Sequence, residues 1–196
     1  QCLKHLGKIA YCQNKYGEAR ARLTNAMTQF QELGDNVGAN QCLHNLGLLE
    51  KEEHNYATSK KYLTEAIVIY ENIDQMLGAA QCLYCLGNIA YDQHDYLEAF
   101  SHYRKALNHF EMLGSSCQND IANCLFSLGN VAYIHNNFIE SEASFKEASK
   151  LYKEMNDRFS QADTLQRLGK VASIQNKFTE AKDAYIAALQ GFQSCG

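Results

Sequence analysis

Apolar residues recur along the chain at intervals of three and four, which is the spacing of one face of an α-helix. In each clear stretch a leucine, a Leu-Gly pair and an aliphatic residue follow one another. Nine residues after the glycine, a second stripe begins with an aromatic residue and ends on an alanine and another aromatic residue. Each stretch therefore predicts two amphipathic helices joined by a short polar turn. One such stretch consists of Leu43, Leu46-Gly47, Leu49, Tyr56, Ser59, Leu63, Ala66 and Tyr70.

The Leu-Gly stretch occurs five times, with spacings between the glycines of 40, 40, 42 and 40 residues. Self-similarity at a fixed period of this size is the signature of a repeat array. One helix pair cannot bury both of its apolar stripes, so we expect the repeats to stack into an all-α solenoid. The predicted repeats span 1–34, 35–74, 75–114, 115–156 and 157–196, and their glycines are Gly7, Gly47, Gly87, Gly129 and Gly169.

Small and capping residues stand at fixed places in the repeats. A glycine inside a helix costs about 1 kcal/mol relative to alanine, so its recurrence indicates close packing. We expect it to face an alanine or serine of the second helix. Asp95 with Glu98 and Asn137 with Glu140 have the spacing of a capping box at the start of a second helix.

Composition supports a helical, soluble chain. The sequence contains no proline, where average usage predicts about ten, and we therefore expect the twelve glycines to mark the turns. The net charge of −4 offers no basic surface for nucleic acid. The apolar runs are far shorter than the ~18 residues of a membrane span, and no signal peptide is recognisable. We expect a cytoplasmic protein and interpret the chain as part of a longer one.

No constellation of catalytic or metal-binding residues stands out. Cys2, Cys42, Cys82 and Cys124 share one repeat position, which predicts small packing residues in a reducing compartment. Cys82 and Cys85 have metal-like spacing, but no second pair accompanies them. The sequence also lacks a glycine-rich phosphate loop and a nucleophile elbow. We therefore expect neither a cofactor, a metal ion nor enzymatic activity.

The order Leu-x-x-Leu-Gly, then Tyr/Phe-x-Glu-Ala, then a closing alanine resembles the tetratricopeptide repeat. This resemblance implies a right-handed superhelical solenoid of helix-turn-helix units whose first helices line a concave groove. The proline that commonly ends the second helix is missing, and we expect that helix to be extended instead. The 40-residue repeat with Gly34-Asp35-x-x-Gly38 resembles the long-unit arrays of Pins/LGN polarity scaffolds and fungal NB-ARC signalling proteins.

The resemblance places the outward positions of each first helix three before, one after and four after the glycine. The middle of this row is aromatic around two asparagines, and its ends are basic. Asparagine amides can pair with a peptide backbone, so the row predicts a protein or peptide ligand that is partly acidic. The candidate groove residues are Lys4, Lys8, Tyr84, Asn88, Tyr91, Phe126, Asn130, Tyr133, Arg167 and Lys170.

Three functions are compatible with this reading. The leading hypothesis is a non-catalytic interaction module that binds a peptide or partner helix and acts as a scaffold. The second is a sensor or autoinhibitory array within a multidomain NB-ARC-like signalling protein. The third is end-to-end self-association, because the last repeat ends without a polar capping helix and leaves an apolar face exposed.

Overall fold

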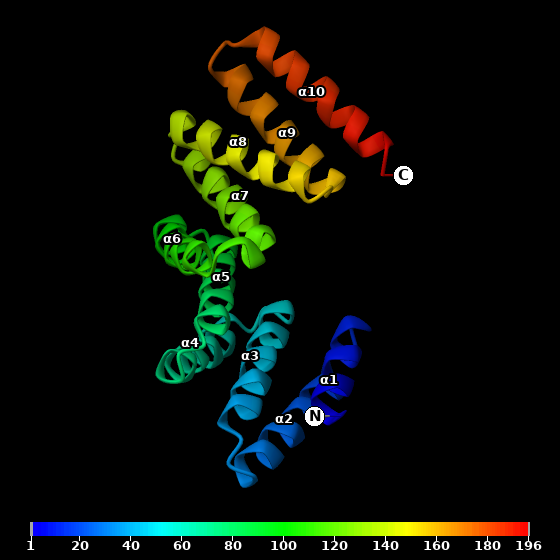
Figure 1. Cartoon of the computed structure of the whole chain (residues 1–196), viewed down its shortest axis with the longest axis vertical. Helices are drawn as coiled ribbons and strands as arrows, with labels where there is room; N and C mark the ends of the chain where they lie inside the picture. The colour runs from blue at the N-terminus through cyan, green and yellow to red at the C-terminus, as the bar shows by residue number, and fades with distance from the viewer. Residues whose placement is uncertain (1, 196) are drawn as a thin grey trace. The chain divides into compact units, whose positions relative to one another are not determined.

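The computed structural model describes residues 2–195, and the chain in this range is built from helices without strands (Figure 1). Two compact halves are present: the N-terminal half, residues 1–102, and the C-terminal half, residues 103–196. The boundary between them falls inside α6. The helices are α1 (Cys2–Cys12), α2 (Tyr16–Glu32), α3 (Asn36–Glu52), α4 (Tyr56–Asn72), α5 (Met76–Asp92), α6 (Tyr96–Leu113), the 3₁₀ helix η1 (Gly114–Cys117), α7 (Gln118–Ile134), α8 (Phe138–Glu154), α9 (Arg158–Ile174) and α10 (Phe178–Gln193).

Within each half, every helix packs against the next one along the chain. In the N-terminal half this holds for α1 through α5, and in the C-terminal half for α7 through α10. Partners such as α9 and α10 run antiparallel (Figure 1). A helix that contacts mainly its sequence neighbours is the mark of a repeat solenoid. The expected all-α fold of stacked helix pairs is therefore confirmed in each half.

In the second predicted repeat, the first and second helices have the same length. The helices α3, α4 and α5 each contain 17 residues. Three-residue turns separate them, which accounts for the 40-residue spacing. The second helix α4 is as long as the first helix α3, so both helices of this pair share the extra length of the 40-residue repeat. The single spacing of 42 arises because α6 has 18 residues and is followed by the four-residue η1.

A residue in the left-handed backbone conformation, with a positive φ, follows each helix from α1 to α9. Each lies one or two residues beyond the last helical residue, where a positive φ reverses the chain. The expectation that glycine marks the turns was largely wrong, since asparagine, histidine and aspartate occupy most of these positions. Asparagine and aspartate tolerate this conformation because their short side chains bond locally. The residues are Asn14, Gly34, His54, Asp74, His94, Gly114, Asn136, Asn156 and Asn176.

Side-chain caps begin several helices as the sequence predicts. Asp95 accepts a hydrogen bond from the Glu98 backbone N–H at 3.0 Å. Asn137 accepts one from the Glu140 N–H at 3.4 Å, and its amide donates to the Glu140 carboxylate at 2.7 Å. Asp157 caps α9 in the same way. These bonds satisfy amide groups that have no partner inside the helix.

The recurring glycines let the two helices of a pair approach closely. The Gly47 carbonyl accepts a hydrogen bond from the Ser59 hydroxyl at 2.6 Å. A Cβ added to Gly47 would lie 2.9 Å from Leu63, and one added to Gly129 would lie 2.7 Å from the Phe145 ring. The expected serine contact is present, and a large side chain one turn further along adds to it. The second helix therefore presses its bulkiest residue against the glycine.

Candidate functional site

In the C-terminal half, the five predicted groove residues come together between α7 and α9. Asn130, Tyr133, Arg167 and Lys170 line one cavity of about 70 Å³, which the Phe145 ring closes from α8. Phe126, the fifth predicted residue, contacts this group through Arg167. The Arg167 guanidinium carbon lies 5.8 Å from the centre of the Phe126 ring. An amide, a phenol and two cations thus meet around a single small cavity.

Arg167 is only loosely paired within its own half. Its Nε lies 3.7 Å from the Asp163 carboxylate one turn earlier on α9, which is too long for a hydrogen bond. The same Nε has no hydrogen-bond partner in the described part of the chain. Lys170, one turn later on α9, is exposed. The two cations outnumber the single carboxylate, so the cavity favours an anionic group.

A cavity at the same repeat position lies between α1 and α3 in the N-terminal half. Its volume is about 220 Å³. Lys8, Tyr11 and Leu23 take the places of Asn130, Tyr133 and Phe145, while Asn45 and Leu48 take those of Arg167 and Lys170. This cavity is larger and more apolar, because leucines replace the phenylalanine and one cation. The candidate residue set omits Tyr11, Asn45 and Leu48, although their spacing from the glycine equals that of residues in the set.

The repeat position of Lys4 predicts an exposed side chain in the groove, but the structure buries this side chain. Its side chain is only 7% exposed. Its ammonium donates to the Gln41 side chain of α3 at 2.5 Å and lies 6.0 Å from the centre of the Phe30 ring. The charge of Lys4 is therefore used to join α1 to its neighbours, and Lys8 is the exposed predicted cation of this half.

Tyrosines four residues after the glycine pack against the start of the following helix. The Tyr91 ring meets the Tyr96 ring edge-on, with centroids 5.4 Å apart. Tyr11 with Tyr16 and Tyr133 with Phe138 repeat this contact at 6.1 and 5.9 Å. Part of the aromatic character of the row thus serves packing inside each pair. Tyr84 and Asn88, the other predicted residues of α5, are half-buried, as is Tyr91.

The repeat positions of these side chains agree with a known family. Residues 79–154 match the tetratricopeptide repeat family model. This region covers most of α5 and all of α6, α7 and α8. The tetratricopeptide repeat is in general a non-catalytic interaction module. No curated protein matches the sequence significantly.

Solved structures share the fold over nearly the whole chain at low identity. BtubC (BKLC) from P. vanneervenii is 17% identical with a TM-score of 0.88, over 98% of this chain and 79% of that one. A Rap protein complexed with Competence and Sporulation Factor is 19% identical with a TM-score of 0.76, over 96% and 52%. A signal-transduction ATPase (STAND) protein with a tetratricopeptide repeat sensor, from Pyrococcus horikoshii, is 17% identical with a TM-score of 0.84, over 97% and 29%. The chain thus spans about half of the Rap protein and less than a third of the STAND protein.

One histidine occupies the repeat position three residues before the glycine. His44 stands where Tyr84 and Phe126 stand in later repeats. Burial, together with the nearby Lys8 ammonium, lowers its pKa to about 4. Its ring lies edge-on to Tyr70, with centroids 6.2 Å apart, and its Nε2 has no hydrogen-bond partner in the described chain. At neutral pH His44 is therefore an uncharged packing group.

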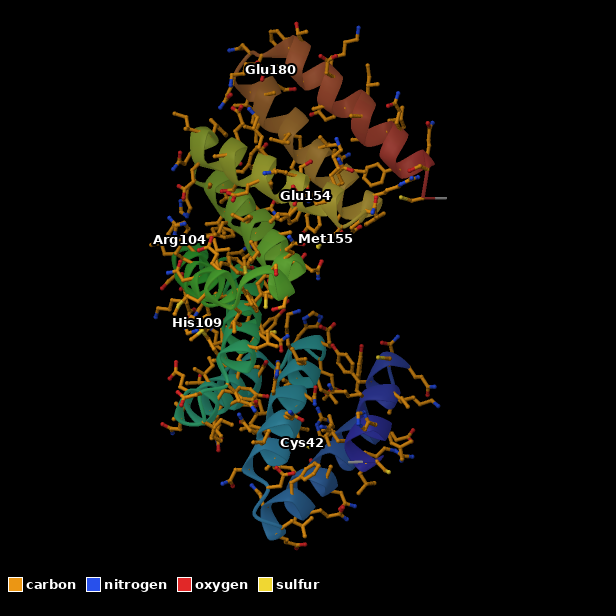
Figure 2. All side chains as sticks on the ribbon, viewed as in Figure 1. Cys42, Arg104, His109, Glu154, Met155 and Glu180 are labelled. Carbon is orange, nitrogen blue, oxygen red and sulfur yellow. The ribbon has the colours of Figure 1, made fainter. Side chains whose placement is uncertain are left out.

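The cysteines that share one repeat position serve mainly as packing residues. Cys42, labelled on α3 in Figure 2, lies in a cluster with Ala26, Phe30 and Ala39. Cys42, Cys82 and Cys124 are buried, whereas Cys2 is exposed. Burial raises the pKa of the Cys82 thiol, and it raises the pKa of Cys85 to about 12. Protonated thiols are poor nucleophiles and poor metal ligands.

The described residues offer no cluster of three or more His, Cys, Asp or Glu side chains that could hold a metal ion. Among the helices between residues 2 and 195, none is both long and apolar enough to cross a membrane.

Proposed function

We propose that this chain is a non-catalytic protein-interaction module that binds a peptide or partner helix along its first helices and acts as a scaffold. The observation that carries this proposal is the cavity between α7 and α9, where Asn130, Tyr133, Arg167 and Lys170 converge. The asparagine amide can pair with both the N–H and the C=O of a peptide backbone. Tyrosine adds rigid contact area at a small entropic cost.

The charges favour a partly acidic partner. Arg167 and Lys170 border the cavity of the C-terminal half, and among residues 2–195 only Asp163 stands within ion-pair distance of Arg167. An aspartate or glutamate side chain of the ligand fits this place, since arginine pairs well with carboxylates. The equivalent cavity beside Leu23 and Leu48 suits an apolar side chain. A ligand with acidic and apolar residues would use both kinds of cavity.

Fold relatives support a peptide or protein ligand in general terms. The Rap protein with the shared fold was solved in complex with Competence and Sporulation Factor. The 40-residue spacing of the repeats is also that of the Pins/LGN-like scaffolds. We propose this long-unit type of tetratricopeptide array, made of the five repeats 1–34, 35–74, 75–114, 115–156 and 157–196, and a cytoplasmic location.

An alternative function is a sensor or autoinhibitory array of a multidomain NB-ARC-like signalling protein. The STAND protein that shares the fold carries a tetratricopeptide repeat sensor, and this chain covers 29% of it. In that case the first-helix cavities would contact another domain of the same protein. Pull-downs with the full-length protein and with this chain separate the two functions, because an internal contact in the full-length protein would compete with external partners.

End-to-end self-association is a further candidate, favoured by the two outer faces. Leu6 of α1 is 42% exposed, whereas Leu46 at the same position of α3 is 3% exposed. Ile186 and Leu189 of α10 are exposed and border a cavity of about 490 Å³. These faces correspond to the stacking faces inside the solenoid, so one copy of the chain could continue another.

The groove proposal is tested with a fluorescent peptide of alternating glutamate and leucine residues, measured by fluorescence anisotropy. We expect the double variant Arg167→Ala, Lys170→Ala to weaken binding at least about tenfold, which equals 1.4 kcal/mol. The matched control is Lys150→Ala, Lys153→Ala, which removes two exposed lysines of α8 outside the cavity. Equal affinities for wild type and the cavity variant would contradict the proposal.

A further inference from the structure

A second hollow, separate from the first-helix cavities, lies among α2, α3 and α4 of the N-terminal half. Its volume is about 440 Å³, and none of the ten candidate groove residues lines it. Met27, Tyr62, Ile69 and Ile73 give it apolar walls, and Gln31, Asn36 and Asn72 add uncharged polar groups. Pockets of this size that combine apolar walls with polar groups are typical binding sites.

Asn40 lines this hollow and breaks the repeat pattern. The corresponding residues of the next three repeats are Ala80, Ala122 and Ala162, all of them buried. Asn40 is also buried, with 1% of its surface exposed. A polar side chain therefore replaces alanine at a position that the other repeats keep apolar. Burying a polar group is unfavourable unless it is hydrogen-bonded.

Only one end of the Asn40 amide is paired. Its Nδ2 donates to the Ala66 carbonyl of α4 at 3.1 Å. This bond fixes the orientation of the amide, because the reverse orientation would place two acceptor oxygens against each other. The Asn40 Oδ1 then has no hydrogen-bond partner in the described part of the chain. The group that completes this site must be a donor.

Glu50 shows that a polar replacement in α3 can be fully paired. It too stands where the other repeats have alanine. One of its carboxylate oxygens accepts a hydrogen bond from Arg20, and the other accepts one from Asn55, each at 2.9 Å. Asn40, on the same helix, lacks this completion. The contrast shows that a buried polar side chain of α3 can be paired within the chain, while the Asn40 oxygen is left with capacity for a donor from a ligand.

The charge of the residues that line the hollow favours a positively charged donor group on the ligand. Glu65 is the one charged residue among the described residues that line it. The ligand therefore combines an apolar stem, a hydrogen-bond donor and a positive charge. Lysine has all three, since its methylene chain covers apolar surface while its ammonium donates only. Arginine is also cationic, but its rigid planar fork spreads five donors apart and fits one buried acceptor beside one carboxylate less well than a compact ammonium.

We propose that the hollow among α2, α3 and α4 binds a lysine side chain of a protein partner, with its ammonium between Asn40 Oδ1 and Glu65. The stem lies along Met27 and Ile69. The Asn40 oxygen is buried, so part of the lining must move when the lysine enters. Met27 is suited to this movement, because its unbranched chain has three rotatable bonds. The lining residues differ from those of the groove, so the two proposals can fail separately.

The test is a titration of the ¹⁵N-labelled chain with Nα-acetyl-lysine methylamide, followed by NMR. We expect saturable shifts of the Asn40 side-chain amide and of backbone amides around the hollow. The norleucine analogue keeps the apolar stem without the ammonium, and the Nε-acetylated analogue removes the charge. We expect both to bind at least tenfold more weakly.

Variants locate the binding. Asn40→Ala restores the alanine of the other repeats and should abolish the saturable shifts without unfolding the chain. Glu65→Gln should weaken lysine binding, whereas Glu71→Gln, on the same helix but outside the hollow, should leave it unchanged. Equal binding of the norleucine analogue, or full binding by Asn40→Ala, would overturn the proposal. Absence of saturable shifts in wild type would also overturn it, since the hollow would then hold water only.

Discussion

The Ser59 hydroxyl donates to the Gly47 carbonyl across 2.6 Å and ties α4 to α3. Ser141 makes the same bond to the Gly129 carbonyl at 2.9 Å in the C-terminal half. The serine can reach the backbone of the facing helix because glycine leaves no Cβ in the way. The small residue in each pair thus permits a polar link as well as close packing.

Adding a methyl group at a packed glycine should destabilise the chain. We expect Gly129→Ala to lower the free energy of unfolding by about 1–3 kcal/mol, because its Cβ would lie 2.7 Å from the Phe145 ring. Gly17→Ala is the matched control, since its Cβ would meet nothing within 4 Å. That variant should gain about 0.5–1 kcal/mol from helix propensity. Urea unfolding followed by circular dichroism measures both, and equal stabilities would contradict the packing role of Gly129.

The ion pair between Arg20 and Glu50 should show strong coupling. Glu50 is 6% exposed, so Arg20→Ala leaves a buried carboxylate with less compensation and should cost about 2 kcal/mol. Glu50→Ala restores the residue of the other repeats and should be close to neutral. In the double variant, the loss caused by Arg20→Ala should largely disappear. A double-mutant cycle in chemical unfolding measures this, and additive single effects would be the contrary result.

Acid should destabilise the chain through His44. Its pKa falls from 6.5 to about 4 on folding, so the unfolded chain binds this proton more readily between these values. Stability is therefore fully present above pH 6.5 and is lost as the pH falls toward 4. His44→Phe copies the residue at position 126. We expect this variant to lose less stability than wild type between pH 6.5 and 4, by on the order of 2 kcal/mol. Unfolding curves at several pH values test this, with His5→Phe, at an exposed position of α1, as the control; parallel profiles for wild type and His44→Phe would contradict it.

Self-association should depend on the outer face of α10. Replacing Leu189 by glutamate places a charge among exposed apolar residues, and we expect it to lower the apparent mass of the chain at high concentration. Leu33→Glu is the control, because Leu33 is exposed in the turn after α2. Sedimentation velocity measures the effect. A wild-type chain that stays monomeric at the highest soluble concentration would rule out association through this face.

Local sequence patterns predict much of this fold because each repeat is built from local contacts. The Leu-Gly spacing locates the first helices, and the caps at Asp95 and Asn137 appear as hydrogen bonds. The equal helix lengths were not predictable from the missing proline alone. The absence of proline only removes one obstacle to a longer helix. The helix ends at residues with a positive φ, such as Asn14 and His54.

The candidate site was predicted in part. In the C-terminal half the predicted residues converge, because their offsets from the glycine place them on facing sides of α7 and α9. Lys4 shares such an offset but is buried, since Gln41 and Phe30 lie beside it. Contacts of that kind depend on the neighbouring repeat, which a pattern within one repeat does not specify. The roles of the ten candidate residues stay predictions.

The proline-free turns also have a kinetic consequence. Slow refolding of many proteins reflects isomerisation of bonds preceding proline, which takes tens of seconds or longer. This sequence has no such bond, and its helices contact mainly their immediate neighbours within each half. Local contacts of this kind favour rapid folding. After dilution from denaturant, the chain should regain its helices without a proline-limited phase, so each pair can re-form soon after a partner or a force has pulled it open.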